Sequence, residues 1–315
     1  MNVKMGIVMD PIEHIKTVKD TTFAMMLEAQ RRNWQIFYMQ PQDIWLHAGL
    51  TWAEMSELSV DDVTSSPFGI LNTLTQPLVE LDVLLIRKDP PFNMEYIYMT
   101  YLLEQAQAKG LLVVNNPSSI RDANEKLFAS WFPQCCPNTL VTAKKSHLLE
   151  FANHEKEIVI KPLGGMGGHS IFHLVATDLN LNVTIEMLTQ QETQMVMAQR
   201  FIPEIKYGDK RILLIDGEPI GYALARIPHK GDFRGNLAAG ASTEGKELTD
   251  RDLWICEQVG PELKKRGLLF VGLDVIGDFL TEINVTSPTC ARELDKIFNL
   301  NIAGDFLDVI EQKLI

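Results

Sequence analysis

Oxygen-bearing side chains cluster near the C-terminal end of the sequence, at Asp274, Glu282 and Asn284. They fall in the segment 269–285, whose two apolar runs flank a glycine-containing turn, a pattern that predicts two antiparallel strands. A two-residue loop would mix charged and apolar side chains on both faces of this hairpin. A three-residue loop at 277–279 instead sets Asp274 opposite Glu282 and leaves the other face apolar, so we expect that register.

Two carboxylates and an amide oxygen on one face suit Mg²⁺, or Mn²⁺ in its place, because these cations prefer oxygen ligands and share them with substrate phosphates. The alternative is a hairpin whose polar face simply meets water, as one face of an antiparallel pair often does. A buried acidic pair without a cation would be costly, so burial of this face would favour the metal site.

A second candidate is the segment 161–170, KPLGGMGGHS, which has four glycines within five residues, namely Gly164, Gly165, Gly167 and Gly168. Glycine lets backbone N–H groups converge on an anion, so the loop is a candidate phosphate cradle. It is neither a P-loop nor a dinucleotide fingerprint, because no Lys-Ser/Thr pair follows and residues 170–174 are strand-like. A glycine loop between antiparallel strands is typical of a flap over a triphosphate, and a plain flexible hairpin is the alternative.

Two lysines are candidates for contact with phosphate groups. Lys161 ends the apolar stretch 157–161, which predicts a strand that holds the ammonium group at the edge of a site. Lys126 lies in a predicted short helix over 125–132. On its own it would more often be a solvated surface lysine.

Residues 227–246 show no clear periodicity, and a stretch of this length predicts a functional lid. Three arginines, Arg211, Arg226 and Arg234, lie within it or shortly before it. Guanidinium groups bind carboxylates through paired hydrogen bonds, so we expect a substrate that carries a carboxylate. Solvated surface arginines are the alternative.

The composition excludes several other classes of protein. Lys and Arg number 29 against 41 Asp and Glu, and the resulting charge of −12 argues against a nucleic-acid partner. The apolar stretches are strand-sized, so we expect no membrane span, and Asp10 interrupts the N-terminus before a signal peptide can form, which indicates the cytoplasm. The four cysteines are too poorly spaced for a disulfide framework or zinc site, and no HExxH or GxSxG motif occurs.

The elements that position these groups divide the chain into three parts. Strand and helix signals alternate over residues 1–122, which predicts a doubly wound parallel sheet of α/β class. Residues 47–78 are weakly patterned, and we expect an irregular insertion there. The pattern beyond residue 122 is mostly antiparallel and of α+β class, with a further boundary near residue 200, so we expect domains at 1–122, 123–200 and 201–315.

Seven segments in order along the chain resemble the bacterial glutathione synthetases, a family of ATP-grasp ligases. They are MGIVMDP (5–11), LIRKDPPF (85–92), VVNNPSSIRDANEKL (113–127), VIKPLGGMGGHSIF (159–172), GDKRILLIDGEPI (208–220), RGNLAAG (234–240) and GLDVIGDFLTEINVTSPT (272–289). The resemblance implies an ATP-grasp fold with an N-terminal parallel-sheet domain, a lid domain and a C-terminal antiparallel-sheet domain. It also implies that ATP activates the carboxylate of γ-glutamylcysteine as an acyl phosphate, which glycine attacks to give glutathione.

Motif by motif, the resemblance implies roles for the residues singled out above. Those implied to contact ATP are Lys126, Lys161, Gly164, Gly165, Gly167, Gly168, Gln199, Phe201, Ile202 and Asp209. Those implied to hold the metal are Asp274, Glu282 and Asn284. Those implied to orient the peptide and the transferring phosphate are Arg211, Arg226, Arg234 and Asn236.

Two positions depart from the family pattern: Gly164 stands where an acid is expected, and Ala241 replaces a glycine. The resemblance further implies a homotetramer. Two other functions stay open, an ATP-grasp ligase for a different carboxylate and amine, and a nucleotide-binding regulator without catalysis.

Overall fold

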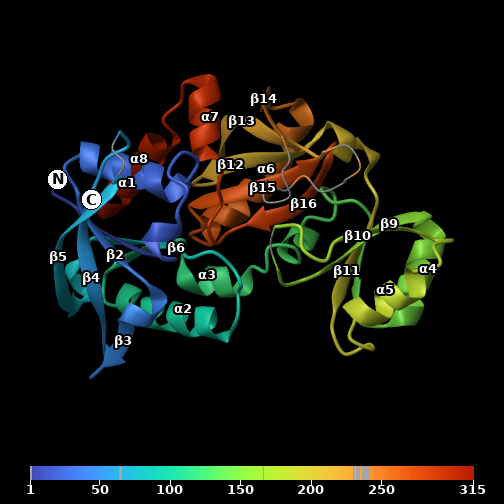
Figure 1. Cartoon of the computed structure of the whole chain (residues 1–315), viewed down its shortest axis with the longest axis horizontal. Coiled ribbons are helices and arrows are strands. Elements are labelled where there is room, and N and C mark those ends of the chain that lie inside the picture. The colour runs from blue at the N-terminus through green and yellow to red at the C-terminus, as the bar shows by residue number, and fades with distance from the viewer. Residues whose placement is uncertain (1, 64–65, 166, 230, 232–234, 236–241) are drawn as a thin grey trace.

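The computed structural model describes residues 2–63, 66–165, 167–229, 231, 235 and 242–315. It is built on three β-sheets, and Figure 1 shows the N-terminal sheet and the second sheet at opposite ends with the C-terminal sheet between them. In this described part of the chain, no helix is both long enough and apolar enough to cross a membrane.

The N-terminal sheet has a parallel centre, as the strand and helix alternation predicts. Its parallel strands are β1 (Lys4–Met9), β2 (Gln35–Met39), β6 (Val83–Arg87) and β7 (Leu112–Val114). The helices are α1 (Thr21–Arg31), α2 (Met94–Gln107) and α3 (Pro117–Asp122). Asp20 and Asn93 cap α1 and α2 by accepting hydrogen bonds from backbone N–H groups of the first turn, which favours the start of each helix at this point.

The irregular insertion expected at 47–78 is wrong. The structure has β3 (Ile44–His47), β4 (Leu50–Val60) and β5 (Phe68–Pro77), which extend the sheet in antiparallel fashion beside β2. Most of β5 is exposed, and a bulge between Glu57 and Leu58 interrupts the alternation of β4, so neither strand carries a clean period of two.

The second sheet is antiparallel, in the order β10-β9-β11-β8. Its elements are β8 (Thr139–Thr142), α4 (Lys145–Glu155), β9 (Glu157–Pro162), β10 (Phe172–Val175), α5 (Leu181–Leu188) and β11 (Val196–Arg200). It has its own small core, which includes Leu148, Ile160 and Ile185. The helix expected over 125–132 is only a 3₁₀ turn at Phe128–Trp131.

The C-terminal sheet has the order β14-β13-β12-β15-β16, with every pair antiparallel. Its strands are β12 (Asp209–Ile215), β13 (Glu218–Ile227), β14 (Ser242–Glu247), β15 (Phe270–Ile276) and β16 (Phe279–Asn284). The helices are α6 (Asp250–Lys265), α7 (Ala291–Phe298) and α8 (Ile302–Leu314).

The hairpin of β15 and β16 pairs Asp274 with Glu282, as predicted, and it also pairs Gly272 with Asn284, but the expected three-residue loop is wrong. Ile276 pairs with Phe279, so the loop has only two residues. A register shift beyond Asp274 adds one residue on β16 and restores the expected face.

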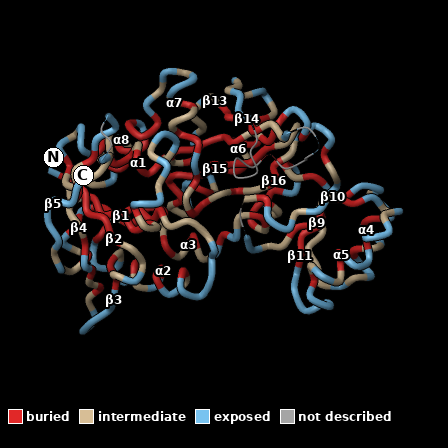
Figure 2. Tube along the Cα trace, in the orientation of Figure 1, coloured by how far each residue is buried: buried red, intermediate tan, exposed pale blue. Residues whose placement is uncertain are grey.

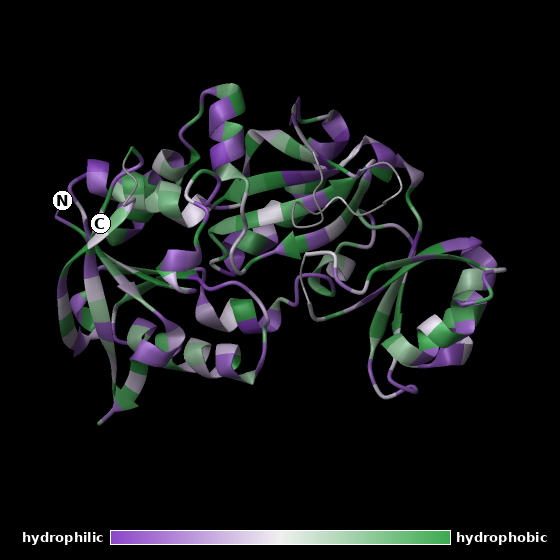
Figure 3. Cartoon of the chain, viewed as in Figure 1, coloured by the Kyte–Doolittle hydropathy of each residue, from purple (hydrophilic) through white to green (hydrophobic). Residues whose placement is uncertain are grey.

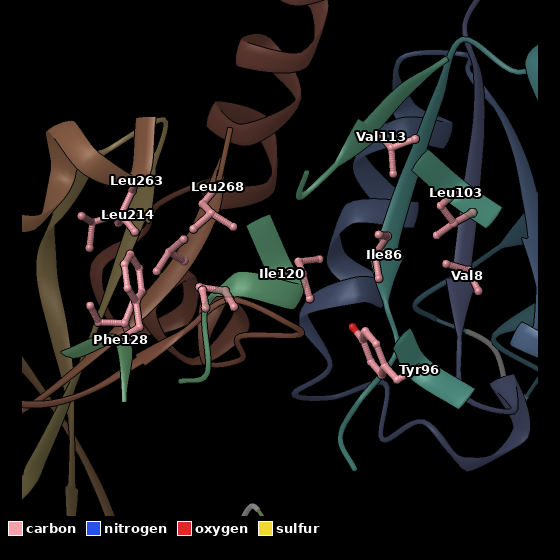
Figure 4. Close-up of a cluster of buried hydrophobic side chains, with 14 of the residues drawn as sticks. Val8, Ile86, Tyr96, Leu103, Val113, Ile120, Phe128, Leu214, Leu263 and Leu268 are labelled. Atoms are coloured by element: carbon pink, nitrogen blue, oxygen red, sulfur yellow. The ribbon is translucent and has the colours of Figure 1, made fainter. Parts of the chain in front are cut away.

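Two large cores join the first and last thirds of the chain. One contains Val8 and Ile86 together with Phe128 and Leu214, which Figure 4 shows as sticks. The other packs α1 against α8 through residues such as Phe23 and Phe306. Figure 2 shows buried positions concentrated along the strands of the N-terminal and C-terminal sheets, and Figure 3 shows many hydrophobic residues in the same strands. The C-terminal sheet is therefore held firmly against the N-terminal part, which fixes the position of the site between them.

Candidate active site

A cavity of about 290 Å³ lies where the three sheets approach one another. The loop after β6 lines it with Asp89, the segment after α3 with Lys126, and the second sheet with Gln199. The C-terminal sheet supplies Asp274 and Glu282. Groups that are widely separated in the sequence thus face one space.

Both candidate lysines are buried and line this cavity. Lys126 Nζ lies 3.2 Å from Glu282 Oε1 and donates a hydrogen bond of 2.9 Å to the carbonyl oxygen of Gly165. Lys161, in β9, has its Nζ 3.4 Å from the carbonyl oxygen of Thr281. Burial lowers the pKa of Lys161, and the nearby charge of Lys126 lowers it further. Two ammonium groups therefore lie beside Thr281 and Glu282 of the hairpin, where phosphate oxygens would find charged donors.

The glycine loop joins β9 to β10, two antiparallel strands, as expected for a flap. Gly165, Gly167 and Gly168 line the cavity, and all three have positive φ, a conformation that favours glycine. Gly164 is exposed, does not line the cavity and has an ordinary φ. A Cβ at Gly164 would meet open space, so the acid expected there would fit this backbone.

The wall next to β11 is apolar with a few polar groups. Gln199 is buried, and its Nε2 donates to Thr139 Oγ1 at 3.1 Å. Phe201 and Ile202 line the cavity, and the Phe201 ring stacks on His173 with a centroid distance of 3.8 Å. A flat aromatic ligand would find both apolar surface and backbone polar groups here.

Two arginines and two aspartates form a buried network across β12, β13 and β15. Arg211 Nε donates to Asp274 Oδ1 at 2.6 Å. Arg226 Nη2 lies 2.5 Å from Asp209 Oδ2 and 3.0 Å from Asp274 Oδ2. All four side chains are buried and line the cavity. The arginines expected to meet a carboxylate substrate are thus held in place by protein carboxylates.

The two aspartates of this network differ in electrostatic character. Burial raises the pKa of Asp209 to about 7, and Arg226 only partly opposes this. Burial would also raise the pKa of Asp274, but Arg211 and Arg226 more than offset it and hold that pKa below its usual range. Asp209 Oδ1 is buried and has no hydrogen-bond partner among the described residues. A group that donates a hydrogen bond to this oxygen would relieve the cost of its burial.

The three residues predicted to hold a metal all line the cavity. Asn284 Nδ2 donates to the carbonyl oxygen of Gly272 at 3.1 Å, which leaves its amide oxygen for another partner. Asp274 is already engaged by arginines, so Glu282 and Asn284 are the more available ligands. Within the described residues, no group of three or more His, Cys, Asp or Glu side chains could hold a metal by itself. The donor set of two carboxylates and an amide fits Mg²⁺, which commonly binds through few protein ligands and takes the rest from substrate and water.

Sequence reasoning missed Glu125, which also lines the cavity. Its Oε1 accepts hydrogen bonds from Val285 N at 3.2 Å and from Thr286 Oγ1 at 2.8 Å. Burial raises the pKa of Glu125, and the charge of Glu282 adds to this effect. Its position next to Lys126 was the one signal in the sequence that could have drawn attention to it.

Two predicted residues, Arg234 and Asn236, lie outside the described part of the chain, as does Ala241. Gly235, between the first two, lines the cavity. A Cβ at Gly235 would lie 2.7 Å from Asp209 Cβ and 2.8 Å from the carbonyl oxygen of Arg226. The close approach requires glycine and brings this point of the 227–246 segment against the buried network.

Comparison with known proteins identifies the family of the chain. Residues 3–121 match the family model for the N-terminal domain of prokaryotic glutathione synthetase, and residues 125–299 match the model for its ATP-grasp domain. The chain is 60% identical to glutathione synthetase of Coxiella burnetii, over 99% of this chain and 98% of that protein. It is 56% identical to glutathione synthetase of Pseudomonas syringae pv. tomato, over 100% of this chain and 98% of that protein.

Among solved structures, the crystal structure of D-cycloserine synthetase has a similar fold, with a TM-score of 0.66 at 10% identity. The match covers 99% of this chain and all of that one, and at this identity it supports the fold alone. The expected ATP-grasp fold is confirmed. The two family models together span nearly the whole sequence, and the chain belongs to the prokaryotic glutathione synthetase family.

Proposed function

We propose that this chain joins γ-glutamylcysteine and glycine to form glutathione, with ATP converted to ADP and phosphate, and that the reaction takes place in the cavity described above. Family membership supports the overall reaction. The observation that carries the site assignment is the meeting of two lysines, a glycine loop and a carboxylate-amide pair around one space.

The reaction needs no nucleophile from the protein. The γ-phosphate of ATP passes to the cysteinyl carboxylate of the peptide, and the amine of glycine then displaces phosphate from the resulting acyl phosphate. The amine loses a proton as the C–N bond forms and the C–O bond breaks. Catalysis on this route consists of positioning the reactants and neutralising charge.

Lys126 and Lys161 are proposed to bind the phosphate groups of ATP, because they are the buried ammonium groups nearest the hairpin. The positive-φ glycines Gly165, Gly167 and Gly168 would direct backbone N–H groups at the same phosphates. Gly164, which is exposed and does not line the cavity, would lie at the outer part of this loop. Exclusion of water by this flap and by the 227–246 segment would protect the acyl phosphate from hydrolysis.

Glu282 and Asn284 are proposed to hold Mg²⁺, or Mn²⁺ in its place, with Asp274 contributing lone pairs that the arginines leave free. When bound, the metal would offset negative charge on the phosphates.

Gln199, Phe201 and Ile202 are proposed to contact the adenine, through backbone groups and apolar surface. Oδ1 of Asp209, the buried oxygen that lacks a partner among the described residues, would accept a hydrogen bond from a ribose hydroxyl group.

Arg211 and Arg226 are proposed to orient the peptide carboxylate and the transferring phosphate. Their contacts with Asp274 and Asp209 fix the guanidinium planes in advance of binding. Arg234 and Asn236 are proposed to join them from the 227–246 segment.

The three sheets support division into domains at 1–122, 123–200 and 201–315, with the middle domain acting as the lid. We further propose a homotetramer in the cytoplasm. Light scattering of the purified protein and fractionation of cells test these two points.

The test of the function is Mg²⁺-dependent release of ADP from ATP in the presence of γ-glutamylcysteine and glycine. Each substrate is omitted in turn, and the product is identified by mass spectrometry. Release that requires all three, with a product mass equal to that of glutathione, supports the proposal. Release only with another acid and amine would reassign the substrates. No release with any pair would indicate a regulator that binds nucleotide without catalysis.

A further inference from the structure

The segment 124–126, which lies between α3 and β8, contacts two elements that line the active-site cavity. One is the glycine loop: Asn124 Nδ2 donates to the carbonyl oxygen of Leu163 at 3.2 Å, and Lys126 Nζ donates to that of Gly165 at 2.9 Å. The other is β16 together with the residues that follow it, which the middle residue of the segment contacts. The segment therefore joins the glycine loop to the strand that carries the proposed metal ligands.

The middle residue, Glu125, binds the outer side of β16. This strand is the last in the order of the C-terminal sheet, so the backbone groups on its outer side need partners from outside the sheet. The carbonyl oxygen of Glu125 accepts a hydrogen bond from Ile283 N at 2.9 Å. Its Oε1 accepts from Val285 N at 3.2 Å, from Thr286 N at 3.3 Å and from Thr286 Oγ1 at 2.8 Å. One residue thus takes the place of a neighbouring strand beside the end of β16.

These hydrogen bonds fix the proposed metal ligands through the backbone. Asn284 lies between Ile283 and Val285, and the N–H groups of both neighbours bond to Glu125. Because side chains alternate along a strand, holding these two positions sets the direction in which Asn284 and Glu282 project. Both of those side chains line the cavity. The place of Asn284 relative to Glu125 is therefore closely determined.

Glu125 also determines where the side chain of Lys126 begins, because the two residues are adjacent. Lys126 Nζ lies 3.2 Å from Glu282 Oε1. The ammonium group proposed for phosphate and the oxygens proposed for the metal are thus held from one point. A divalent cation shared between a nucleotide and a protein has to meet both sets of groups at once. A change in their separation would weaken that joint contact more than it would weaken binding of the nucleotide alone.

We propose that Glu125 is a positioning residue, which holds Asn284 and Lys126 at the separation that lets the site bind a nucleotide and its divalent cation together. The inference rests on the proposed function, because it takes ATP and Mg²⁺ as the ligands. Glu125 acts through its hydrogen bonds to Val285 and Thr286, so an acceptor oxygen is what this position requires.

The test measures how much Mg²⁺ strengthens ATP binding, by calorimetric titration with Mg²⁺ and with a chelator, in the absence of peptide and glycine. Glu125→Ala removes Oε1 and should reduce the gain from Mg²⁺ about tenfold, the effect of leaving buried donors without their acceptor. ATP affinity with the chelator should change by less than about twofold. Glu125→Gln keeps an acceptor oxygen and should retain the gain within about twofold. Glu257→Ala, at an exposed position of α6, is the control and should leave the gain unchanged.

A second pair of variants tests the same contact even where Glu125→Ala fails to fold. Thr286→Val keeps the shape of the side chain and removes only the hydroxyl that donates to Glu125. It should reduce the gain from Mg²⁺ about fivefold, the effect of one hydrogen bond. Thr286→Ser keeps the hydroxyl and should retain the gain within about twofold.

Equal weakening of ATP binding with Mg²⁺ and with the chelator would show that Glu125 acts only through general stability, and would overturn the inference. A Glu125→Gln variant as defective as Glu125→Ala would also overturn it, because the charge and not the acceptor oxygen would then matter. Absence of ATP binding in the wild-type chain would refute the proposed function. Wild-type ATP binding that is indifferent to Mg²⁺, or a gain that is unchanged in Glu125→Ala, would refute only the role of Glu125.

Discussion

Replacement of Asp209 by asparagine should make the folded protein more stable at alkaline pH and leave it almost unchanged in acid. Asp209 Oδ2 accepts from Arg226 at 2.5 Å, while Oδ1 is buried and has no partner among the described residues. Burial raises the pKa of this carboxyl from 3.8 to about 7. Asparagine keeps the shape of the side chain and never ionises, so it removes the cost of the buried charge.

The size of the effect follows from the pKa of Asp209 in the folded and unfolded chain. Between about pH 4 and pH 7 the folded chain retains a proton that the unfolded chain has released, so raising the pH favours unfolding. Three pKa units at about 1.4 kcal/mol each correspond to about 4 kcal/mol. Because Asp209 shares Arg226 with Asp274, part of this belongs to the pair, and we expect a gain of about 2 to 4 kcal/mol at pH 8.

Urea unfolding of the wild type and the Asp209→Asn variant at about pH 5, 7 and 8.5 measures this difference directly. Asp122→Asn, at an exposed position, is the matched control and should show no pH-dependent difference. A difference that is the same at every pH would refute the reasoning. An Asp209→Asn variant that is less stable at pH 8.5 would show instead that the ionised carboxylate stabilises the fold through Arg226.

Four further substitutions test the site. Glu282→Ala should abolish ligation with little loss of melting temperature, because this side chain is partly exposed; full activity in ADP release would remove Glu282 from the metal site. Gly164→Ala should raise the free energy of unfolding by about 0.4 to 1 kcal/mol, because the φ of Gly164 is ordinary and a Cβ there would meet open space. Gly165→Ala should lower the free energy of unfolding by about 1 to 2 kcal/mol, because Gly165 has a φ of +96°. If thermal melting gave the reverse order, it would contradict the loop geometry. Lys126→Gln should weaken ATP binding about tenfold to a hundredfold by calorimetry, because a charge-assisted contact to phosphate is lost; unchanged affinity would place the phosphates elsewhere.

The hairpin of β15 and β16 shows how far an apolar pattern alone can predict a site. The requirement for one apolar face was enough to bring Asp274, Glu282 and Asn284 to the same side. It could not reveal that a bulge, and not a longer loop, produces this register, because either arrangement sets Asp274 opposite Glu282.

Local sequence patterns could not predict the ion pairs of Arg211 and Arg226. Arg211 pairs in register with Asp274 on β15, and Asp209 pairs with Arg226 on β13. These pairings depend on the strand order β13-β12-β15, which tertiary structure decides. The same is true of Glu125, whose role as an acceptor for Thr286 depends on a contact between distant segments.

The balance of charge in the active-site cavity predicts that magnesium would contribute to the binding of ATP. Its described lining has five formal cations and five formal anions: Lys126, Lys161, Arg200, Arg211 and Arg226 against Asp89, Glu125, Asp209, Asp274 and Glu282. Lys126 is matched by Glu282, and the two arginines of the network by the two aspartates.

A triphosphate brings about four negative charges to a lining that has no surplus of positive charge, in a chain of net charge −12. A divalent cation bound with the nucleotide would offset part of that charge next to Glu282, where the lysines alone cannot. Removal of Mg²⁺ by a chelator should therefore weaken ATP binding more than Lys126→Gln does with Mg²⁺ present. Calorimetric titration with and without chelator measures both, and equal ATP affinity in the two conditions would mean that the lysines suffice and that the metal acts only in the chemical step.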